Sequence, residues 1–410
     1  MFLLFRAPPS YFNKKIINVK ITELMKSEDN RWQFETESIH SGQSYNEGTG
    51  AVIPPIFATS TFESGNEHGF DYTRSGNPNF RNLEEVIKGV EKANYATVFA
   101  SGVSAITAIL STLKTDSLIL AEENVYGCTY RLMDQVFKKF GVSVEYVDFT
   151  VGKSIDSISD LKPDLIWIES PTNPMLKILD IESISEASKE IGSTLVVDNT
   201  FASSFVQTPL ELGADISLLS LTKYSNGHSD ALGGVVCCKD ENWGDKMVFA
   251  QKALGLQPSP FDCWLIQRGL KTQSIRVERH SQNAKIVAEY LEERFSEAKI
   301  LYPFLESHPQ YEIAKKQMRL GSGIISVDLG LDLETTKSFL NELKLFTKAE
   351  SLGGIESLVC HPASMTHASV PKDVRESVGI TDSLFRLSVG IENSEDLIKD
   401  VKLALDKIGI

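Results

Sequence analysis

The sequence of 410 residues is poor in cysteine, and its few cysteines are not arranged to pair or to bind a metal. They are odd in number, scattered and without CxxC spacing: Cys128, Cys237, Cys238, Cys263 and Cys360. Disulfide frameworks and zinc sites need paired or regularly spaced cysteines, whereas isolated thiols are typical of a reducing compartment. We therefore expect reduced thiols and a cytoplasmic protein.

Long hydrophobic runs are also absent. No apolar run approaches the roughly 18 residues that span a bilayer, so we expect no membrane segment. Near the N-terminus several Lys and Arg residues precede the first acid, Glu23, but the apolar run is too short for a secretory signal. Ser and Arg are too few for an organelle transit peptide. We expect this N-terminal stretch to be a disordered arm or an upstream extension ahead of Met25, with a transit role as the alternative.

Positive charge is in the minority, with 41 Lys and Arg residues against 55 Asp and Glu residues and a formal net charge of −14. This balance argues against nucleic acid or an anionic membrane as a partner. It leaves room for a local basic pocket that binds a small anion. The length exceeds that of one ordinary domain, which indicates a large domain and a smaller one.

Short apolar runs alternate with amphipathic segments from about residue 100 to residue 240. The runs that predict strands lie at 117–122, 142–149, 164–170, 194–200, 216–222 and 233–239. The segments that predict helices between them lie at 103–113, 130–141 and 181–192. This alternation predicts an α/β fold with a doubly wound, mostly parallel sheet and helices on both faces.

The chain divides into three parts on this pattern. Residues 1–75 form an N-terminal extension and an arm, which is rich in Gly, Pro, Thr and Ser over 41–75. Residues 76–270 form the α/β domain, and residues 271–410 form a smaller α+β domain. A single long helix predicted at 275–298 leads into the smaller domain.

Ligands of open α/β sheets bind at the carboxyl ends of the strands, so the residue after each apolar run samples the site. These residues are acids, hydroxyls, one aromatic and one amine: Tyr126, Glu169, Asp198, Ser220, Thr222 and Lys223. Any one of them alone could merely cap a strand. Together they include no His, Cys and Asp cluster suited to a metal. Cys360, His361 and His367 in LVCHPASMTH also fit no common zinc spacing.

The set at the strand ends specifies the chemistry of pyridoxal 5'-phosphate. A lysine that is kept neutral by burial, such as Lys223, can bond to a carbonyl carbon. An aspartate such as Asp198 can pair with a pyridinium nitrogen. In ASGVSAITAIL, Ser101 and Gly102 open a helix whose N–H groups can hold a phosphate, and Tyr126 can stack on the ring.

Many segments resemble, in order, the pyridoxal-phosphate enzymes of Cys/Met metabolism that carry out transsulfuration. The family includes cystathionine γ-synthases, cystathionine γ-lyases, cystathionine β-lyases and methionine γ-lyases. The segments are YTRSGNPN, FASGVSAI, NVYGCTYRLM, IESPTNP, VVDNTF, SLTKYSNGHSD, AESLGGIESL, MTHAS and FRLSVGIE. The resemblance runs from about Ile39 to the C-terminus and implies the aspartate-aminotransferase-like fold, fold type I of these enzymes.

The resemblance implies a role for each matching residue. Lys223 carries the cofactor, Asp198 pairs with the pyridine nitrogen, and Tyr126 stacks on the ring and transfers protons. The residues expected to hold the phosphate are Gly102, Val103, Ser220 and Thr222. Tyr72 and Arg74 reach the phosphate of a neighbouring subunit, so the expected unit is a dimer of active-site pairs, assembled into a homotetramer. The residues expected to bind the carboxylate of an amino-acid substrate are Asn173, Ser351 and Arg386.

The choice of reaction within the family depends on few residues. Glu350 resembles the acid that meets the distal ammonium of cystathionine, and Arg131 resembles the arginine that binds its distal carboxylate. Cys128 is a departure, because YGCT is similar to the methionine γ-lyases where YGGT is usual; it is otherwise a small thiol near the site. The segments KYSNGHSD and QKALGLQPSPFDCWLIQRGLKT resemble the lyases.

The predicted activity is therefore that of a cystathionine γ-lyase, which releases cysteine, 2-oxobutanoate and ammonia from L-cystathionine by γ-elimination. A cystathionine γ-synthase, which joins an activated homoserine ester to cysteine, is the main alternative. A methionine γ-lyase and an O-acetylhomoserine sulfhydrylase are further alternatives. A silent paralogue that only binds the cofactor is the non-enzymatic alternative, and the intact Lys223, Asp198, Tyr126, Arg74 and Arg386 argue against it.

Overall fold

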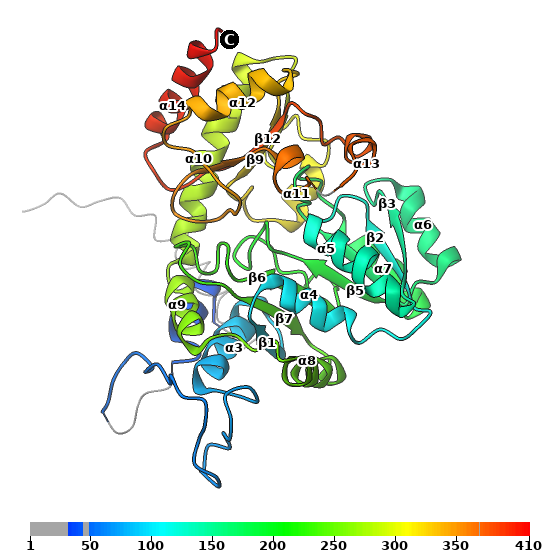
Figure 1. Ribbon diagram of the computed structural model, residues 1–410, viewed down its shortest axis with the longest axis vertical. Helices are drawn as coiled ribbons and strands as arrows, with labels where there is room; N and C mark the ends of the chain where they lie inside the picture. Colours follow the sequence, from blue (N-terminus) through cyan, green and yellow to red (C-terminus); the bar gives the residue numbers. More distant parts are fainter. Residues whose placement is uncertain (1–31, 44–48, 369) are drawn as a thin grey trace, which may run out of the picture.

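The computed structural model describes residues 32–43, 49–368 and 370–410 (Figure 1). Its strands are β1 (Tyr95–Phe99), β2 (Leu118–Glu122), β3 (Ser143–Val147), β4 (Leu165–Glu169), β5 (Thr194–Asp198), β6 (Ile216–Ser220), β7 (Gly234–Cys238), β8 (Lys299–Leu301), β9 (Ile324–Asp328), β10 (Thr347–Lys348), β11 (Leu358–Cys360) and β12 (Leu384–Ser388).

Its α-helices are α2 (Phe34–His40), α3 (Pro78–Glu91), α4 (Gly102–Leu110), α5 (Gly127–Arg131), α6 (Gly152–Leu161), α7 (Ile181–Ile191), α8 (Glu241–Leu254), α9 (Pro260–Leu270), α10 (Gln273–Arg294), α11 (Tyr311–Gln317), α12 (Leu333–Glu342), α13 (Lys372–Ser377) and α14 (Ser394–Lys407). Shorter turns of other helix types are η1 (Leu132–Val136), η2 (Phe137–Phe140) and η3 (Pro362–Ser364).

The large sheet has seven strands in the order β1-β7-β6-β5-β4-β2-β3. Neighbouring strands from β6 to β3 are parallel, and β7 alone is antiparallel to its neighbours β1 and β6. The prediction of a mostly parallel α/β sheet is therefore confirmed.

Successive residues of the central strands pack on opposite faces of this sheet, as the two-residue period of a strand requires. Trp167 of β4 lies in the core under α4 and α8, whereas its neighbours Ile166 and Ile168 pack with α6 and α7. All five residues of β4 are buried. Both faces are thus covered by helices, which explains why the strands read as continuous apolar runs.

The segment predicted as one helix over 130–141 is not a regular α-helix. It consists of the single turn α5, the π turn η1 and the 3-10 turn η2, and it ends at Gly141 in the left-handed conformation. A π turn inserts one extra residue and changes the face of every side chain after it. As a result Met133 is buried in the core, while Phe140 remains exposed.

The long helix α10 follows the large sheet and leads into a five-stranded sheet in the order β10-β11-β12-β9-β8. Residues of α10, α12 and α14 pack on this smaller sheet around Phe339 and Phe385, whose ring centroids are 5.2 Å apart. The smaller sheet lies above the large one in Figure 1, with the C-terminal helix at its outer edge. The division of the chain at residue 270 stays a prediction.

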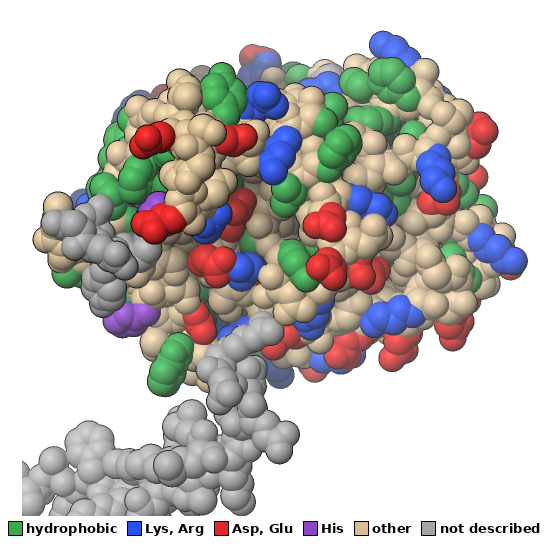
Figure 2. Space-filling model, turned by 90° about the horizontal axis from the view of Figure 1, so that it is seen from below, with side chains coloured by type: hydrophobic (Ala, Val, Ile, Leu, Met, Phe, Trp, Pro, Cys, Tyr) green, Lys and Arg blue, Asp and Glu red, His purple; other side chains and the backbone are tan. Residues whose placement is uncertain are grey.

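Residues 49–76 project from the body as extended loops below α3 (Figure 1). Within this arm Thr61 and Tyr72 form an isolated antiparallel bridge. On the face shown in Figure 2, acidic and basic side chains lie interspersed. No helix among the described residues is both long and apolar enough to cross a membrane. Of the predicted extension and arm over residues 1–75, residues 1–31 and 44–48 lie outside the described residues, and Phe34–His40 form the helix α2.

Candidate active site

A cavity of about 370 Å³ lies at the carboxyl ends of β4, β5 and β6 and reaches to residues of the smaller domain. All predicted site residues line it except Tyr72, Arg74 and Arg131. The predicted location at the strand ends thus coincides with the observed cavity. Which role each side chain plays there stays a prediction.

Two acids on one side of the cavity end neighbouring parallel strands. Glu169 ends β4, Asp198 ends β5, and the two are register partners with exposed fractions of 4% and 8%. Asp198 Oδ1 accepts a hydrogen bond from the main-chain N–H of Thr200 at 3.0 Å. Burial raises the pKa of Asp198 to about 6, and no described cation lies close enough to lower it. Asp198 is therefore a buried acid that lacks a cationic partner in the described chain.

The N-terminus of α4 forms a concave main-chain surface beside the end of β6. Ser101 caps the helix by accepting a hydrogen bond from the main-chain N–H of Ser104 at 3.1 Å. A side-chain carbon on Gly102 would lie 2.9 Å from Ser220 Cβ, so only glycine allows this approach. Val103 and Thr222 complete the group. Main-chain N–H groups at a helix start, with adjacent hydroxyls, are suited to bind a phosphate.

Lys223 lies in the turn that follows β6, between the large sheet and the smaller domain. Its Nζ donates a hydrogen bond to Ser351 Oγ at 2.8 Å. Burial lowers the pKa of Lys223 to about 8, and the positive charge of Arg386 contributes to this shift. A substantial fraction of the amine is therefore neutral near physiological pH, as a nucleophile or a base requires.

Arg386 of β12 lies at the side of the cavity formed by the smaller domain and is 2% exposed. Its Nη1 donates to Asn173 Oδ1 at 2.8 Å, and its Nη2 donates to the main-chain oxygen of Ser351 at 3.0 Å. Its Nε is buried without a partner among the described residues. Ser351 adopts a positive φ of 108°, which a non-glycine residue rarely does. The guanidinium thus retains a donor for a carboxylate.

Tyr126 immediately precedes α5, and its main-chain N–H donates to Glu169 Oε1 at 2.8 Å. Burial raises the pKa of the Tyr126 phenol, and the adjacent Cys128 raises it further. The phenol is therefore protonated at physiological pH and can act as an acid. Arg131 Nη2 donates to Cys128 Sγ at 2.7 Å, so Arg131 is directed to this thiol outside the cavity wall.

Tyr72 and Arg74 lie on the exposed arm, away from the cavity of their own chain. The Arg74 guanidinium carbon lies 5.6 Å from the centre of the Tyr72 ring, and Nη1 donates to the main-chain oxygen of Lys252 at 3.2 Å. The single chain therefore leaves open the prediction that these two residues serve a neighbouring subunit.

Further residues line the cavity, among them Thr200 and Phe201, which were not predicted, and Glu169, which was named at its strand end but was given no role. The Phe201 ring centre lies 5.4 Å from the Arg386 guanidinium carbon, and Thr200 binds both Asp198 and the main-chain N–H of Ser220. Thr200 and Phe201 follow Asp198 in the string VVDNTF, and Glu169 ends a strand. These positions, beside a predicted site residue or at a strand end, are the sequence signal that could have indicated their place in the cavity.

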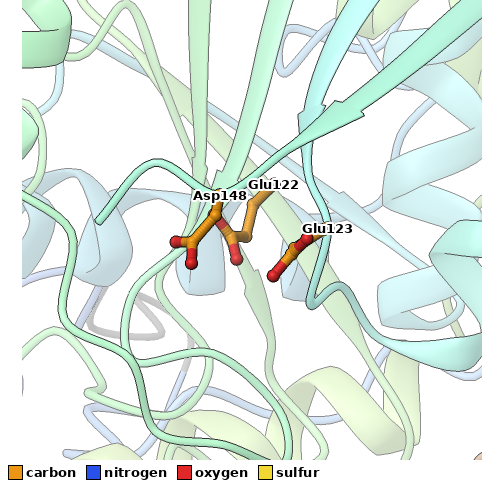
Figure 3. A group of neighbouring side chains, drawn as sticks. All are labelled: Glu122, Glu123 and Asp148. Atoms are coloured by element: carbon orange, nitrogen blue, oxygen red, sulfur yellow. The ribbon is translucent and has the colours of Figure 1, made fainter. Parts of the chain in front are cut away.

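Three carboxylates, Glu122, Glu123 and Asp148, converge outside this cavity (Figure 3). The Lys177 ammonium lies 3.3, 2.9 and 3.0 Å from their oxygens, respectively. A protein cation thus already neutralises part of the charge of this cluster. The cluster therefore gives no reason to infer a bound metal ion.

A family model of Cys/Met metabolism PLP-dependent enzymes matches residues 35–406. The chain belongs to this family. Cystathionine gamma-lyase of Dictyostelium discoideum is 44% identical over 385 residues, which cover 93% of this chain and 100% of the relative. Cystathionine beta-lyase of Lactococcus lactis is 45% identical over 377 residues, 91% of this chain and 99% of the relative.

Solved structures of the same family superimpose closely on this chain. Cystathionine gamma-lyase of Lactobacillus plantarum, complexed with L-serine, has 38% identity and a TM-score of 0.88 over 92% of this chain and 99% of that structure. Cystathionine gamma synthase of Xanthomonas oryzae pv. oryzae, in complex with aminoacrylate and cysteine, has 38% identity and a TM-score of 0.89 with the same coverage. The predictions of fold type I, of a PLP-dependent enzyme and of its cofactor are confirmed.

The cavity of this family member fits pyridoxal phosphate. The buried Asp198 can receive the pyridinium N–H, which would supply the cation it lacks. The close approach at Gly102 shapes a concave main-chain surface for the phosphate. Lys223 presents an amine with a lowered pKa in the same cavity. The three observations concern the pyridine nitrogen, the phosphate and the carbonyl carbon of the cofactor, and each is consistent with pyridoxal phosphate as the bound group.

Proposed function

We propose that this enzyme cleaves L-cystathionine by γ-elimination and releases cysteine, 2-oxobutanoate and ammonia. Relatives that are 44% and 45% identical bear the name cystathionine gamma-lyase, which supports this activity. The charge distribution of the cavity supports it as well, because Arg386 and Glu350 line the same space. Arg386 suits the α-carboxylate, and Glu350, exposed at the wall of the cavity, suits the distal ammonium of cystathionine.

The single observation that carries this proposal is the pairing of Glu350 with the Arg386 clamp in one cavity. Methionine has no charge at its far end, so the Glu350 carboxylate would have no cationic group to bind in a methionine substrate. Cystathionine carries an ammonium and a carboxylate at each end, and an acid at one end of the cavity favours it.

The proposed mechanism assigns a task to each residue. When bound, pyridoxal phosphate supplies an electron-withdrawing ring that stabilises negative charge at the substrate's Cα. The neutral Lys223 amine removes the Cα proton as general base. Lys223, once it has passed on the first proton, takes a second proton from Cβ; the Cγ–S bond then breaks, and the protonated phenol of Tyr126 donates its proton to the departing cysteine sulfur. One water hydrolyses the remaining four-carbon fragment to 2-oxobutanoate and ammonia. Asp198 supplies a fixed negative charge, and Asn173 orients Arg386 on the α-carboxylate.

The products distinguish this proposal from its alternatives. Purified protein with L-cystathionine alone should release cysteine and 2-oxobutanoate in equal amounts, which a thiol assay and a keto-acid assay measure. Homocysteine and pyruvate would instead indicate β-elimination, the activity named for the relative from Lactococcus lactis. If cystathionine is stable but forms from cysteine and an activated homoserine ester, the protein is a γ-synthase. Cleavage of methionine in preference to cystathionine would indicate a methionine γ-lyase.

We further propose a homotetramer built from dimers of active-site pairs, located in the cytoplasm. The exposed position of Tyr72 and Arg74 supports exchange of these residues between subunits. Five free cysteines agree with a reducing compartment. Two inactive variants, Lys223→Ala and Arg74→Ala, should regain activity when refolded together, because one of the two sites of a hybrid dimer is then intact. No recovery in proven hybrids would refute the shared site.

A further inference from the structure

Glu169 and Asp198 form a pair of buried acids without a counterion among the described residues. They end the adjacent parallel strands β4 and β5, face each other in register and project to the same face of the sheet. Neighbouring strands are about 4.8 Å apart, so the two carboxyl groups share one small volume. Neither acid has a described cation among the groups that set its protonation. Two negative charges are therefore costly here, and the pair retains a proton.

The surroundings decide which acid retains this proton. The titratable groups that act on Glu169 are Asp198 on β5 and Glu122 at the end of β2. The main-chain N–H of Tyr126 and the hydroxyl of Thr129 also face it. Burial and then the charge of Asp198 raise the pKa of Glu169 well above its usual range. The pKa of Asp198 rises only to about 6, because Thr200 donates to it from both its N–H and its hydroxyl. Glu169 is also the more deeply buried of the two and has a second acid, Glu122, near it, so the proton of the pair is assigned to Glu169.

Glu169 also holds the main chain at Tyr126. Its Oε1 accepts the Tyr126 N–H at 2.8 Å and lies 3.4 Å from the Thr129 hydroxyl, in the first turn of α5. Glu169, which lines the same cavity, thus fixes the main chain from which the Tyr126 side chain projects. Glu169 bonds to the main chain of the predicted stacking tyrosine and is the register partner of the predicted partner of the pyridine nitrogen.

We propose that Glu169 is a positioning residue that carries the proton of the acid pair and anchors the backbone of Tyr126, so that the pair presents its single negative charge at Asp198. This inference rests on the proposed use of Asp198 and Tyr126 at the cofactor, and it does not depend on which amino acid is cleaved. An ionised Glu169 would repel the negative charge on Asp198. A protonated Glu169 avoids this repulsion and still accepts the Tyr126 N–H.

The protonation of Glu169 can be measured on apoprotein by infrared spectroscopy, from the carbonyl stretching band of a neutral carboxylic acid. Burial also raises the pKa of Glu84, Glu91 and Glu122, each to about 7, so the band of Glu169 is identified from the difference between the wild-type and Glu169→Gln spectra over a range of pH. We expect a band in the wild type that Glu169→Gln removes. Glu91→Gln is the matched control. Glu91 is a fully buried acid at the end of α3 that accepts a hydrogen bond from Ser217 Oγ of β6, and its replacement should leave this band in place.

Asp198→Asn separates the effect of the pair from that of burial. Removing the charge of Asp198 should shift the titration of the Glu169 band to lower pH. Absence of the band in the wild type, its persistence in Glu169→Gln, or an unmoved titration in Asp198→Asn overturns the proposal. Because these spectra need neither cofactor nor substrate, they stand even if the proposed cystathionine cleavage fails.

Activity provides the second readout. Glu169→Gln keeps a neutral group and an oxygen acceptor for Tyr126, so kcat should stay within about threefold of the wild type. Glu169→Leu removes the acceptor and should lower kcat by about ten- to one-hundredfold through misplacement of Tyr126, with little change in KM because Arg386 is untouched. A loss in Glu169→Gln as large as in Glu169→Leu would show that Glu169 works as an anion and would overturn the proposal.

Discussion

Substitution of Gly102 by alanine tests the phosphate-binding part of the cavity. Gly102 is the first residue of α4, and an added Cβ would lie 2.9 Å from Ser220 Cβ and 3.1 Å from Ser220 Oγ. Ordinary carbon–carbon contacts are about 3.5–4.0 Å long, so α4 and the end of β6 must separate by about 0.5–1 Å. Ser220 cannot move freely, because Thr200 Oγ1 accepts its N–H at 2.8 Å.

The size of the effect follows from this overlap. Overpacking of a well-packed site costs about 1–3 kcal/mol. If the strain is relieved by moving α4 away from Ser220, the cost falls on cofactor binding, and affinity should fall by about 5- to 150-fold. The better helix propensity of alanine offsets this by at most about 1 kcal/mol in apoprotein stability. Cofactor affinity should therefore decline much more than the stability of the apoprotein.

The assay is a titration of apoprotein with pyridoxal phosphate, followed by tryptophan fluorescence, with urea unfolding of the apoprotein alongside. Gly152→Ala is a matched control, because Gly152 is also the first residue of a helix, α6, and an added Cβ would meet nothing within 4 Å. It should leave affinity unchanged. If Gly102→Ala binds the cofactor within about twofold of the wild type at equal stability, the phosphate is not held between α4 and Ser220.

Three further outcomes follow from the same geometry. In apoprotein, a reagent that attacks neutral amines should label Lys223 half-maximally near pH 8, because burial and Arg386 lower its pKa to about 8; labelling like a free lysine, near about 10.4, contradicts this. Glu350→Gln should raise the KM for cystathionine about tenfold without raising that for methionine, and equal changes would remove Glu350 from the distal ammonium. Arg276→Met should lower the free energy of unfolding by about 2–5 kcal/mol, because Arg276 donates to the buried main-chain oxygens of Tyr224 at 3.0 Å and Gly269 at 2.8 Å. The exposed Arg279→Met, on the same helix, should cost less than about 0.5 kcal/mol, and an equal loss in both refutes the role of Arg276.

The strands of the large sheet were the most predictable part of the fold. A strand covered on both faces must be apolar throughout, so β4, β5 and β6 are visible as short hydrophobic runs. The antiparallel direction of β7 could not be read in this way, because its residues are as buried as those of β4. Hydrophobicity specifies that a strand is buried and contains no information about its direction. That depends on the connections and on the pairing with β1.

The predicted helix over 130–141 shows the limit of periodicity. Its apolar residues have helical spacing, yet the chain there forms α, π and 3-10 turns in succession. Tertiary contacts decide this outcome: Met133 enters the core, and the rings of Tyr130 and Tyr146 lie 5.5 Å apart. A local pattern cannot anticipate which of several apolar side chains the neighbouring strand will accept.

At the active site, the sequence identifies the residues, whereas their protonation depends on the folded structure. Sequence motifs identify Lys223 and Arg386, but the lowered pKa of Lys223 comes from burial and from the charge of Arg386 on the smaller domain. The hydrogen bond from Lys223 Nζ to Ser351 Oγ likewise joins residues 128 positions apart in the chain. Arg386 and Ser351 of the smaller domain therefore contribute to the environment of this amine. A change that moves this domain away from the amine should raise the pKa of Lys223 before it unfolds the protein.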